Sequence, residues 1–282
     1  MRKRMYAILK VLLVLIATVG TVIVLENISM LVAEHKGALV VLKYVGASSM
    51  AIIPLLLHRW FTRNEKWPLG LNGSKICSRL VIGSLLGAAF MFCCIILVYI
   101  FGGINFAGVN PDIAFGTLFF LITSSFFVSL GEETLFRGSI QGLLKQGYGS
   151  WAGILGSAGI FFIIHGTNPA MFESVVPPLN LLLSGIILGL LREKTGSLWI
   201  PIGFHWTWNT VQELFGLATS GFESKGSLIN ILLVPGKEMI SGGNFGIEGS
   251  IISFIILVLF CAYLLRTKRN SILSESKVQI IK

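Results

Sequence analysis

Residues 119–138 read FFLITSSFFVSLGEETLFRG, an apolar stretch that contains two adjacent carboxylates and an arginine. About 20 predominantly apolar residues are enough to cross a bilayer. Charges inside such a span cost about 2.5–3.5 kcal/mol per residue on insertion scales, and they tend to mark functional sites. The stretch therefore predicts a transmembrane helix whose charged residues, Glu132, Glu133 and Arg137, serve a function.

Composition predicts that the whole chain is embedded in a membrane. Its 282 residues are 54% hydrophobic, and the mean hydropathy is +0.82. Only 12% are charged, against about 25% in a soluble domain. Polar segments are too short for a separate water-soluble domain. We expect an all-α, polytopic bundle of about eight transmembrane helices, near residues 6–27, 38–57, 80–101, 114–145, 150–166, 180–194, 198–216 and 250–266.

The distribution of basic residues predicts the orientation of this bundle. The formal net charge is +9, and sixteen Lys and Arg residues fall on one side of the expected helices against three on the other. Because cytoplasmic loops are enriched in Lys and Arg, we expect both termini in the cytoplasm. The same bias accounts for the charge without a nucleic-acid partner. The basic tail from Thr267 to Lys282 suits contact with anionic lipid.

The expected helices divide the chain into three parts. Residues 1–110 hold three spans, residues 114–216 hold four helices with the charged motifs, and residues 217–282 hold an outer loop, a last span and the basic tail. We expect no site in the outer loop, residues 217–249. A basic start precedes the first apolar run, but no small-residue cleavage site follows, which favours an uncleaved helix over a signal peptide. The four cysteines lack CxxC spacing and are expected to pack.

Glu133 and Arg137 are four residues apart, so they share a helix face and can pair. Glu132 is rotated by about 100° from Glu133 and is left without that partner. A carboxylate in a poor dielectric is suited to act as a general base. Glu132 lies sixteen residues before Tyr148 in the following turn, and His165 lies seventeen after it. The two side chains are therefore expected at matching heights on antiparallel neighbours.

His205 and Asn209, in FHWTWN at 204–209, also share a helix face. They offer two donors to a developing oxyanion, or a ligand and a supporting group for a metal. Glu213 continues this stripe, and we expect it to be a packing or pore-mouth charge.

The helix lengths leave one mismatch in this site. His205 lies about 13 Å along its helix from the turn at Gly196, whereas Glu132 and His165 lie about 25 Å from theirs. The site closes only if the hairpin of the fourth and fifth helices extends further into the cytoplasm than the hairpin that follows it.

Three motifs occur in order on three expected helices: Glu-Glu-x-x-x-Arg at 132–137, Phe-x-x-x-His at 161–165 and His-x-x-x-Asn at 205–209. In this order they resemble the CPBP family of CaaX-protease and bacteriocin-processing proteins, also called Abi proteins. The resemblance covers about Ala114 to Phe215. It includes LSGIILG at 183–189 and TGSLW at 195–199.

The resemblance implies a bundle of membrane helices around a cavity that opens toward the cytosolic side. The residues it implies as functional are Glu132, Glu133, Arg137, His165, His205 and Asn209. By this resemblance the first glutamate and first histidine activate the attacking water. The second histidine and the asparagine stabilise the oxyanion, and the second glutamate and the arginine position the first motif.

We expect an intramembrane endopeptidase that cleaves a membrane-borne protein or peptide, in CaaX-type processing or in bacteriocin maturation and self-immunity. It would be a multi-pass protein, of the plasma membrane if bacterial. Two alternatives stay open: a non-catalytic immunity or regulatory binding protein of the same fold, and a transporter or proton path. Zinc needs three close ligands with an open fourth position, which Glu132, His165 and His205 offer, but we favour a site that requires no metal.

Overall fold

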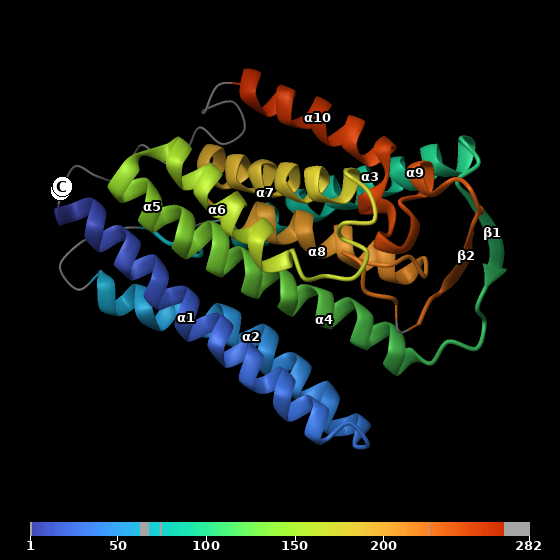
Figure 1. The fold of residues 1–282 in the computed structure, drawn as a ribbon, viewed down its shortest axis with the longest axis horizontal. Helices are drawn as coiled ribbons and strands as arrows, with labels where there is room; N and C mark the ends of the chain where they lie inside the picture. Colours follow the sequence, from blue (N-terminus) through green and yellow to red (C-terminus); the bar gives the residue numbers. More distant parts are fainter. Residues whose placement is uncertain (1, 63–67, 74, 225, 268–282) are drawn as a thin grey trace.

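A computed structural model describes residues 2–62, 68–73, 75–224 and 226–267, and it consists mainly of long helices (Figure 1). The helices are α1 (Arg2–Leu31), α2 (Lys36–Phe61), α3 (Ile76–Ile100), α4 (Phe115–Glu133), α5 (Gln141–Tyr148), α6 (Ser150–His165), α7 (Val176–Thr195), α8 (Trp199–Leu214), α9 (Glu238–Ser241) and α10 (Ile251–Arg266). A π-helical segment, Thr134–Ile140, joins α4 to α5. Each of the predicted helical ranges is present as a helix, and the fourth consists of α4, the π segment and α5.

Among the described residues, five helices are long and apolar enough to cross a membrane. They are Lys3–Leu31, Lys36–Phe61, Ile76–Ile100, Phe115–Tyr148 and Val176–Thr195. Helices α6 and α10 are apolar but shorter, at 16 residues each. The chain is therefore a multi-pass membrane protein, while a count of eight spans stays a prediction. So does the orientation, and most of the predicted basic tail lies outside the described residues.

The start of α7 differs from the sequence prediction by several residues. The helix begins at Val176, and Pro177 and Pro178 occupy its first turn. Proline is favoured there because its missing N–H would have no helical partner anyway and its fixed φ suits a helix. The two prolines therefore extend the helix upstream of the predicted start at residue 180.

Two short strands depart from the predicted all-helical chain. Strand β1 (Ile104–Val109) pairs antiparallel with β2 (Ile229–Leu233), so that Ile104 lies opposite Leu233. Isoleucine, valine and phenylalanine favour this extended geometry. The sheet joins the segment before α4 to the segment after α8, although more than a hundred residues separate them.

Helix α8 lies inside the bundle and packs tightly against α3. A methyl group at Gly83 or Gly87 of α3 would lie 2.2 Å from a backbone oxygen of α8, and one at Gly203 of α8 would lie 2.4 Å from the backbone oxygen of Leu80. Small residues allow helix backbones to approach this closely. The contact fixes the position of α8, which carries His205.

The two ends of the bundle differ in the elements they contain (Figure 1). One end holds the start of α1, the turn between α5 and α6, the junction of α7 and α8, and the end of α10. We call this the basic end, since Arg4, Lys145, Arg192 and Arg266 lie there. The other end, which we call the loop end, holds the α1–α2 turn, the sheet, the α6–α7 connection and residues 217–249.

Candidate active site

Glu132 lies where the two predicted histidines meet. Its Oε1 is 3.8 Å from Nε2 of His165, and its Oε2 is 3.9 Å from Nε2 of His205. The three side chains come from α4, the last residue of α6 and the second turn of α8. The structure therefore brings together the acid and the two imidazoles that the motifs predicted.

The mismatch in helix lengths disappears because α8 begins further from the basic end than the α5–α6 turn does (Figure 1). The segment before α3 packs against the start of α8. The backbone N–H of Leu198 donates to the Gly70 carbonyl at 2.8 Å, and Trp199 Nε1 donates to the Leu71 carbonyl at 2.7 Å. Because α8 starts further along the bundle, its second turn, which carries His205, already lies beside Glu132.

Glu133 is fully buried, and one of its carboxylate oxygens contacts two other side chains. Arg137 Nη1 donates to its Oε1 at 2.9 Å, which is the predicted pairing at i, i+4. His205 Nδ1 lies 3.0 Å from the same oxygen. Arg137 is also buried, with its guanidinium 4.6 Å from the ring centre of Phe161. Glu133 thus links the first motif to the third, a contact that the sequence did not predict.

These contacts fix which ring nitrogens face Glu132. His165 Nδ1 lies 2.9 Å from the Phe161 carbonyl, which can only accept, so this nitrogen carries the proton. His205 Nδ1 likewise donates to the carboxylate of Glu133. The Nε2 atoms of both rings therefore point at Glu132 across distances too long for a direct hydrogen bond. A water molecule that donates to the carboxylate and to a ring nitrogen suits this arrangement.

Asn209 lies one turn beyond His205 and is buried. Its helix face lies along α4, because Trp206 Nε1 donates to the Ile122 carbonyl and Ser125 Oγ donates to Glu213 Oε2 at 3.2 Å. Glu213 therefore packs against α4, as one of its two predicted roles requires. Within the described part of the chain, no hydrogen bond joins the Asn209 side chain to Glu132 or either histidine.

The π segment begins directly after Glu133. It differs from an α-helix in its hydrogen bonds: the Gln141 N–H donates to the Phe136 carbonyl, five residues back. π-helical turns inside α-helices are rare and are frequent at functional sites. All seven residues of the segment are buried, including Arg137, so the segment lies in the protein interior beside the site.

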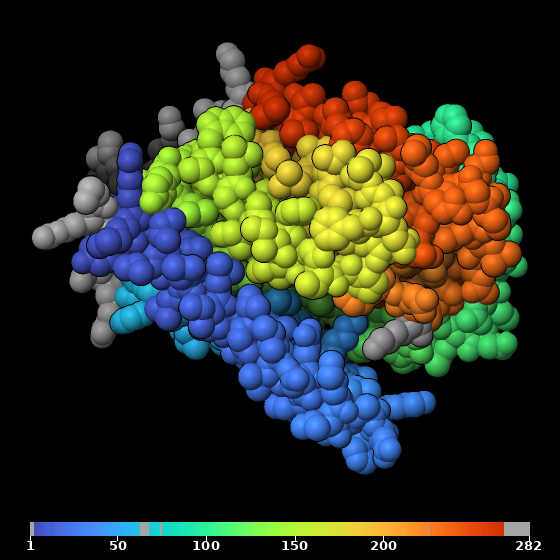
Figure 2. Space-filling model, in the orientation of Figure 1, coloured from blue at the N-terminus to red at the C-terminus, as the bar shows by residue number. Residues whose placement is uncertain are grey.

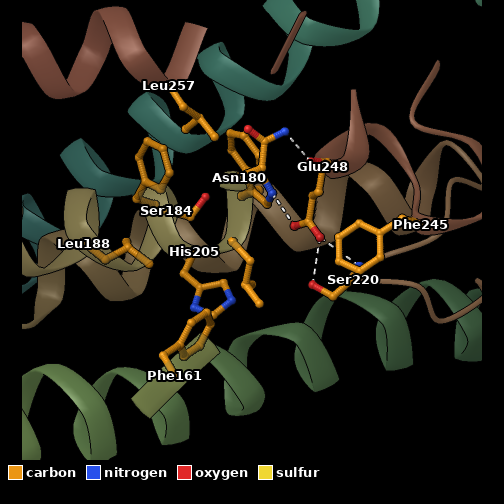
Figure 3. Close-up of a pocket in the computed structure, with 12 residues that line it drawn as sticks. Phe161, Asn180, Ser184, Leu188, His205, Ser220, Phe245, Glu248 and Leu257 are labelled. Atoms are coloured by element: carbon orange, nitrogen blue, oxygen red, sulfur yellow. Dashed lines mark hydrogen bonds between the residues drawn. The ribbon is translucent and has the colours of Figure 1, made fainter. Parts of the chain in front are cut away.

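Two separate cavities lie beside these side chains. A wide cavity of about 950 Å³ includes Glu132 and His165 in its lining and has one wall formed by α1. A small cavity of about 40 Å³ lies on the other side of His205 (Figure 3). At about 10–15 Å³ for each water by this measure, the small cavity has room for about three or four water molecules.

The small cavity contains polar residues that the sequence analysis missed. Glu248 lies in the outer loop where no site was expected, and it accepts from Trp208 Nε1 at 2.6 Å and from Gln212 Nε2 at 3.1 Å. Its second oxygen accepts from the backbone and hydroxyl of Ser220. Asn180 is buried beside it, with Oδ1 unpartnered among the described residues. The one sign of this network in the sequence was a pair of donors, Trp208 and Gln212, that lie four residues apart on α8.

Metal dependence of this site stays a prediction. Among the described residues, no group of three or more His, Cys, Asp and Glu side chains is arranged to hold a metal ion, and this includes Glu132, His165 and His205. The zinc alternative therefore gains no support from the arrangement of these ligands.

Residues 114–211 match the family model described as type II CAAX prenyl endopeptidase Rce1-like. This match confirms the family resemblance drawn from the motifs, and it contains all three of them. A 24.3 kDa protein of Escherichia coli, described as uncharacterized, is 30% identical over 98 residues. The matched part is 34% of this chain and 43% of that protein. No solved structure matches the chain.

Proposed function

We propose, from the match of residues 114–211 to the Rce1-like endopeptidases, that this chain hydrolyses a peptide bond of a membrane-associated protein or peptide. The observation that carries the proposal is the position of Glu132, whose two oxygens face the Nε2 atoms of His165 and His205 at 3.8 and 3.9 Å. A partly buried acid between two imidazoles is suited to take a proton from water and to pass it on.

In the proposed mechanism, Glu132 and His165 hold the attacking water. Both groups accept hydrogen bonds, so the oxygen of the water is left free to attack the carbonyl carbon of the substrate. Glu132 takes the proton as the C–O bond forms, and it then delivers a proton to the leaving amine as the C–N bond breaks. The general base step contributes about 10²–10⁴-fold in enzymes of this kind.

The developing oxyanion requires a donor on the opposite side of the carbonyl. His205 donates at Nδ1 to Glu133, and in the proposed mechanism its ring also carries a proton at Nε2. The protonated ring then donates at Nε2 to the oxyanion, and Asn209 adds an amide donor once the substrate is bound. Arg137 donates to the same oxygen of Glu133, which holds this carboxylate in place and so maintains the orientation of the His205 ring. Preorganised donors of this sort are worth about 2.7–4 kcal/mol each.

The wide cavity supplies the room that a peptide substrate needs. Most of its lining is apolar, and Glu132 and His165 are among its few ionisable groups. An apolar wall binds a hydrophobic segment and keeps bulk water from the reacting groups. CaaX-type processing and bacteriocin maturation both present such a substrate.

The test compares Glu132→Gln with the unaltered protein. Membrane peptides that accumulate in cells with the variant identify substrates, and the best of these is then assayed with purified protein in lipid nanodiscs. We expect the cleavage rate to fall by about 10²–10⁴-fold, as expected for loss of a general base. Glu173→Gln serves as the matched control, because Glu173 is an exposed carboxylate in the α6–α7 connection. Cleavage by Glu132→Gln at the normal rate would refute the mechanism.

The same assay separates the remaining alternatives. Activity that persists after dialysis against a strong zinc chelator supports the metal-free mechanism, whereas loss that zinc restores would replace it with a metal-dependent one. Substrate-dependent flux through liposomes without cleavage would favour a transporter. Protection of cells by both Glu132→Gln and His205→Ala, without any peptide accumulating, would favour a non-catalytic immunity protein.

A further inference from the structure

The wide cavity opens at the loop end of the bundle. Its rim is formed by the last turns of α1, by the connection after α6 and by one residue of the outer loop. These rim residues are Glu26, Ser29, Met30, Ala33, Thr167, Asn168, Pro169 and Phe222. Its floor is formed by Glu132 and His165. Figure 2 shows the far half of α1 standing away from the rest of the molecule on this side.

The cavity is closed toward the basic end. There α1 packs on α5: Ala7, Val11 and Val14 are buried, and a methyl group at Gly147 of α5 would lie 2.8 Å from the Ala7 side chain. The Arg4 guanidinium also lies 5.6 Å from the ring centre of Tyr148. Thr18, one turn beyond Val14, already lines the cavity. The space between α1 and the site therefore widens only in the direction of the loop end.

The charges of the described residues distinguish the two ends. Basic residues of the basic end are Lys3, Arg4, Arg59, Lys75, Arg79, Lys145, Arg192, Lys194 and Arg266, whereas the loop end has Lys36 and Lys237. An excess of Lys and Arg marks the cytoplasmic side of a membrane protein. The cavity therefore opens away from the cytoplasm. The expectation of a cytosolic opening and the expectation of cytoplasmic termini cannot both hold for this chain.

We infer that the site receives its substrate from the non-cytoplasmic side of the membrane. The inference rests on the proposed function, and it names the substrate class: a membrane-inserted peptide, or the membrane-proximal segment of an exported protein, whose scissile bond lies toward the outer face. A prenylated C-terminus that approaches from the cytosol does not belong to this class.

The lining of the cavity also predicts which charge the substrate segment carries. Its ionisable residues are Glu26, Glu132 and His165, and no Lys or Arg is among the described residues that line it. Glu26 lies near the rim, about seven helical turns from Arg2 at the opposite end of α1 when measured at 3.6 residues per turn. A carboxylate in an apolar groove attracts a cation, so the groove suits an apolar segment that contains Lys or Arg.

The test measures from which side of the membrane the rim can be reached. Cys77, Cys93, Cys94 and Cys261 are first replaced by serine or alanine, and Thr167→Cys is introduced at the exposed rim. Gln146→Cys is the matched control, since Gln146 is exposed on α5 at the basic end. Intact cells, or spheroplasts where an outer envelope blocks access, are treated with a charged maleimide that does not cross membranes, before and after permeabilisation.

We expect the cysteine at 167 to react in intact cells and the cysteine at 146 to react only after permeabilisation. The opposite pattern, or equal labelling of both positions before permeabilisation, would overturn the inference. Glu132→Gln separates this result from the proposed function. If that variant still cleaves, the protease proposal fails whatever the labelling. If it does not cleave while position 167 reacts only in permeabilised cells, the protease stands and the outer entry fails.

Discussion

Glu133 is the residue that joins the first motif to the third, because it contacts Arg137, four residues on, and His205 from α8. Its other oxygen, Oε2, has no hydrogen-bond partner in the described part of the chain. Arg137 and His205 therefore both contact the same oxygen, Oε1, and Arg137 is its guanidinium partner. Removing Arg137 leaves the Glu133 carboxylate buried without this cation.

Arg137→Met should destabilise the protein by about 3–5 kcal/mol, since it leaves the Glu133 carboxylate buried without its cation. The double variant Glu133→Gln with Arg137→Met should recover most of this loss, because neither charge remains. Thermal unfolding in nanodiscs measures both. Equal midpoints for the single and double variants would show that the ion pair contributes nothing to stability.

At this scale the sequence predicted the pairs that lie on one helix and the meeting of Glu132 with His165. Spacing at i, i+4 places Glu133 beside Arg137 in any helix, and the turn at Tyr148 sets the heights of its two neighbours. The contact between Glu133 and His205 depends on how far α8 is displaced along the bundle. That displacement comes from the packing of Trp199 against Leu71, a tertiary contact that no sequence pattern indicates.

At the scale of the elements, α3 and α8 approach each other closely at Gly83, Gly87 and Gly203. Apolar periodicity predicted both helices, but it did not predict which glycines face a neighbour, because small residues also occur on lipid-facing surfaces. The prolines of α7 and the π segment were missed for a related reason. Each changes a helix locally without changing its apolar pattern.

Gly87→Ala should destabilise the protein by about 1–3 kcal/mol. Its new methyl would lie 2.2 Å from the Phe204 carbonyl oxygen, so α3 and α8 must separate. Since alanine favours a helix over glycine by about 1 kcal/mol, a purely local effect would have the opposite sign. Gly159→Ala, on α6 with no atom within 4 Å, is the control and should be neutral or stabilising. Thermal midpoints decide between the two outcomes.

Across the whole molecule, the outer loop contributes more than its composition predicted. Glu248 ties this loop to Trp208 and Gln212 of α8, and its backbone carbonyl accepts from Asn180 of α7. Loop residues with long-range partners have no local pattern, so the sequence analysis treated this segment as a connection. The family match covers residues 114–211 and stops short of it.

Glu248→Gln should lower stability by about 1–3 kcal/mol, in line with hydrogen bonds to charged groups. Each carboxylate oxygen of Glu248 accepts hydrogen bonds from two donors. In glutamine one of these oxygens becomes an NH2 group, which cannot accept from the two donors that it faces. Glu223→Gln is the matched control, as Glu223 is exposed in the same loop. An unchanged midpoint for Glu248→Gln would mean that the loop docks by apolar contacts alone.

The attachment of α1 at one end alone has a mechanical consequence. Beyond Thr18 no residue of α1 is buried, and no residue of α2 before Ala47 is buried either. The far half of α1 therefore exchanges protein contacts for lipid contacts when it swings outward. Lipid tails are as apolar as leucine, so hydrophobic burial opposes such a swing only weakly. We therefore expect the far half of α1 to respond to the thickness and lateral pressure of the surrounding bilayer, whereas α2 stays attached to α4 through the hydrogen bond between Tyr44 and Thr123.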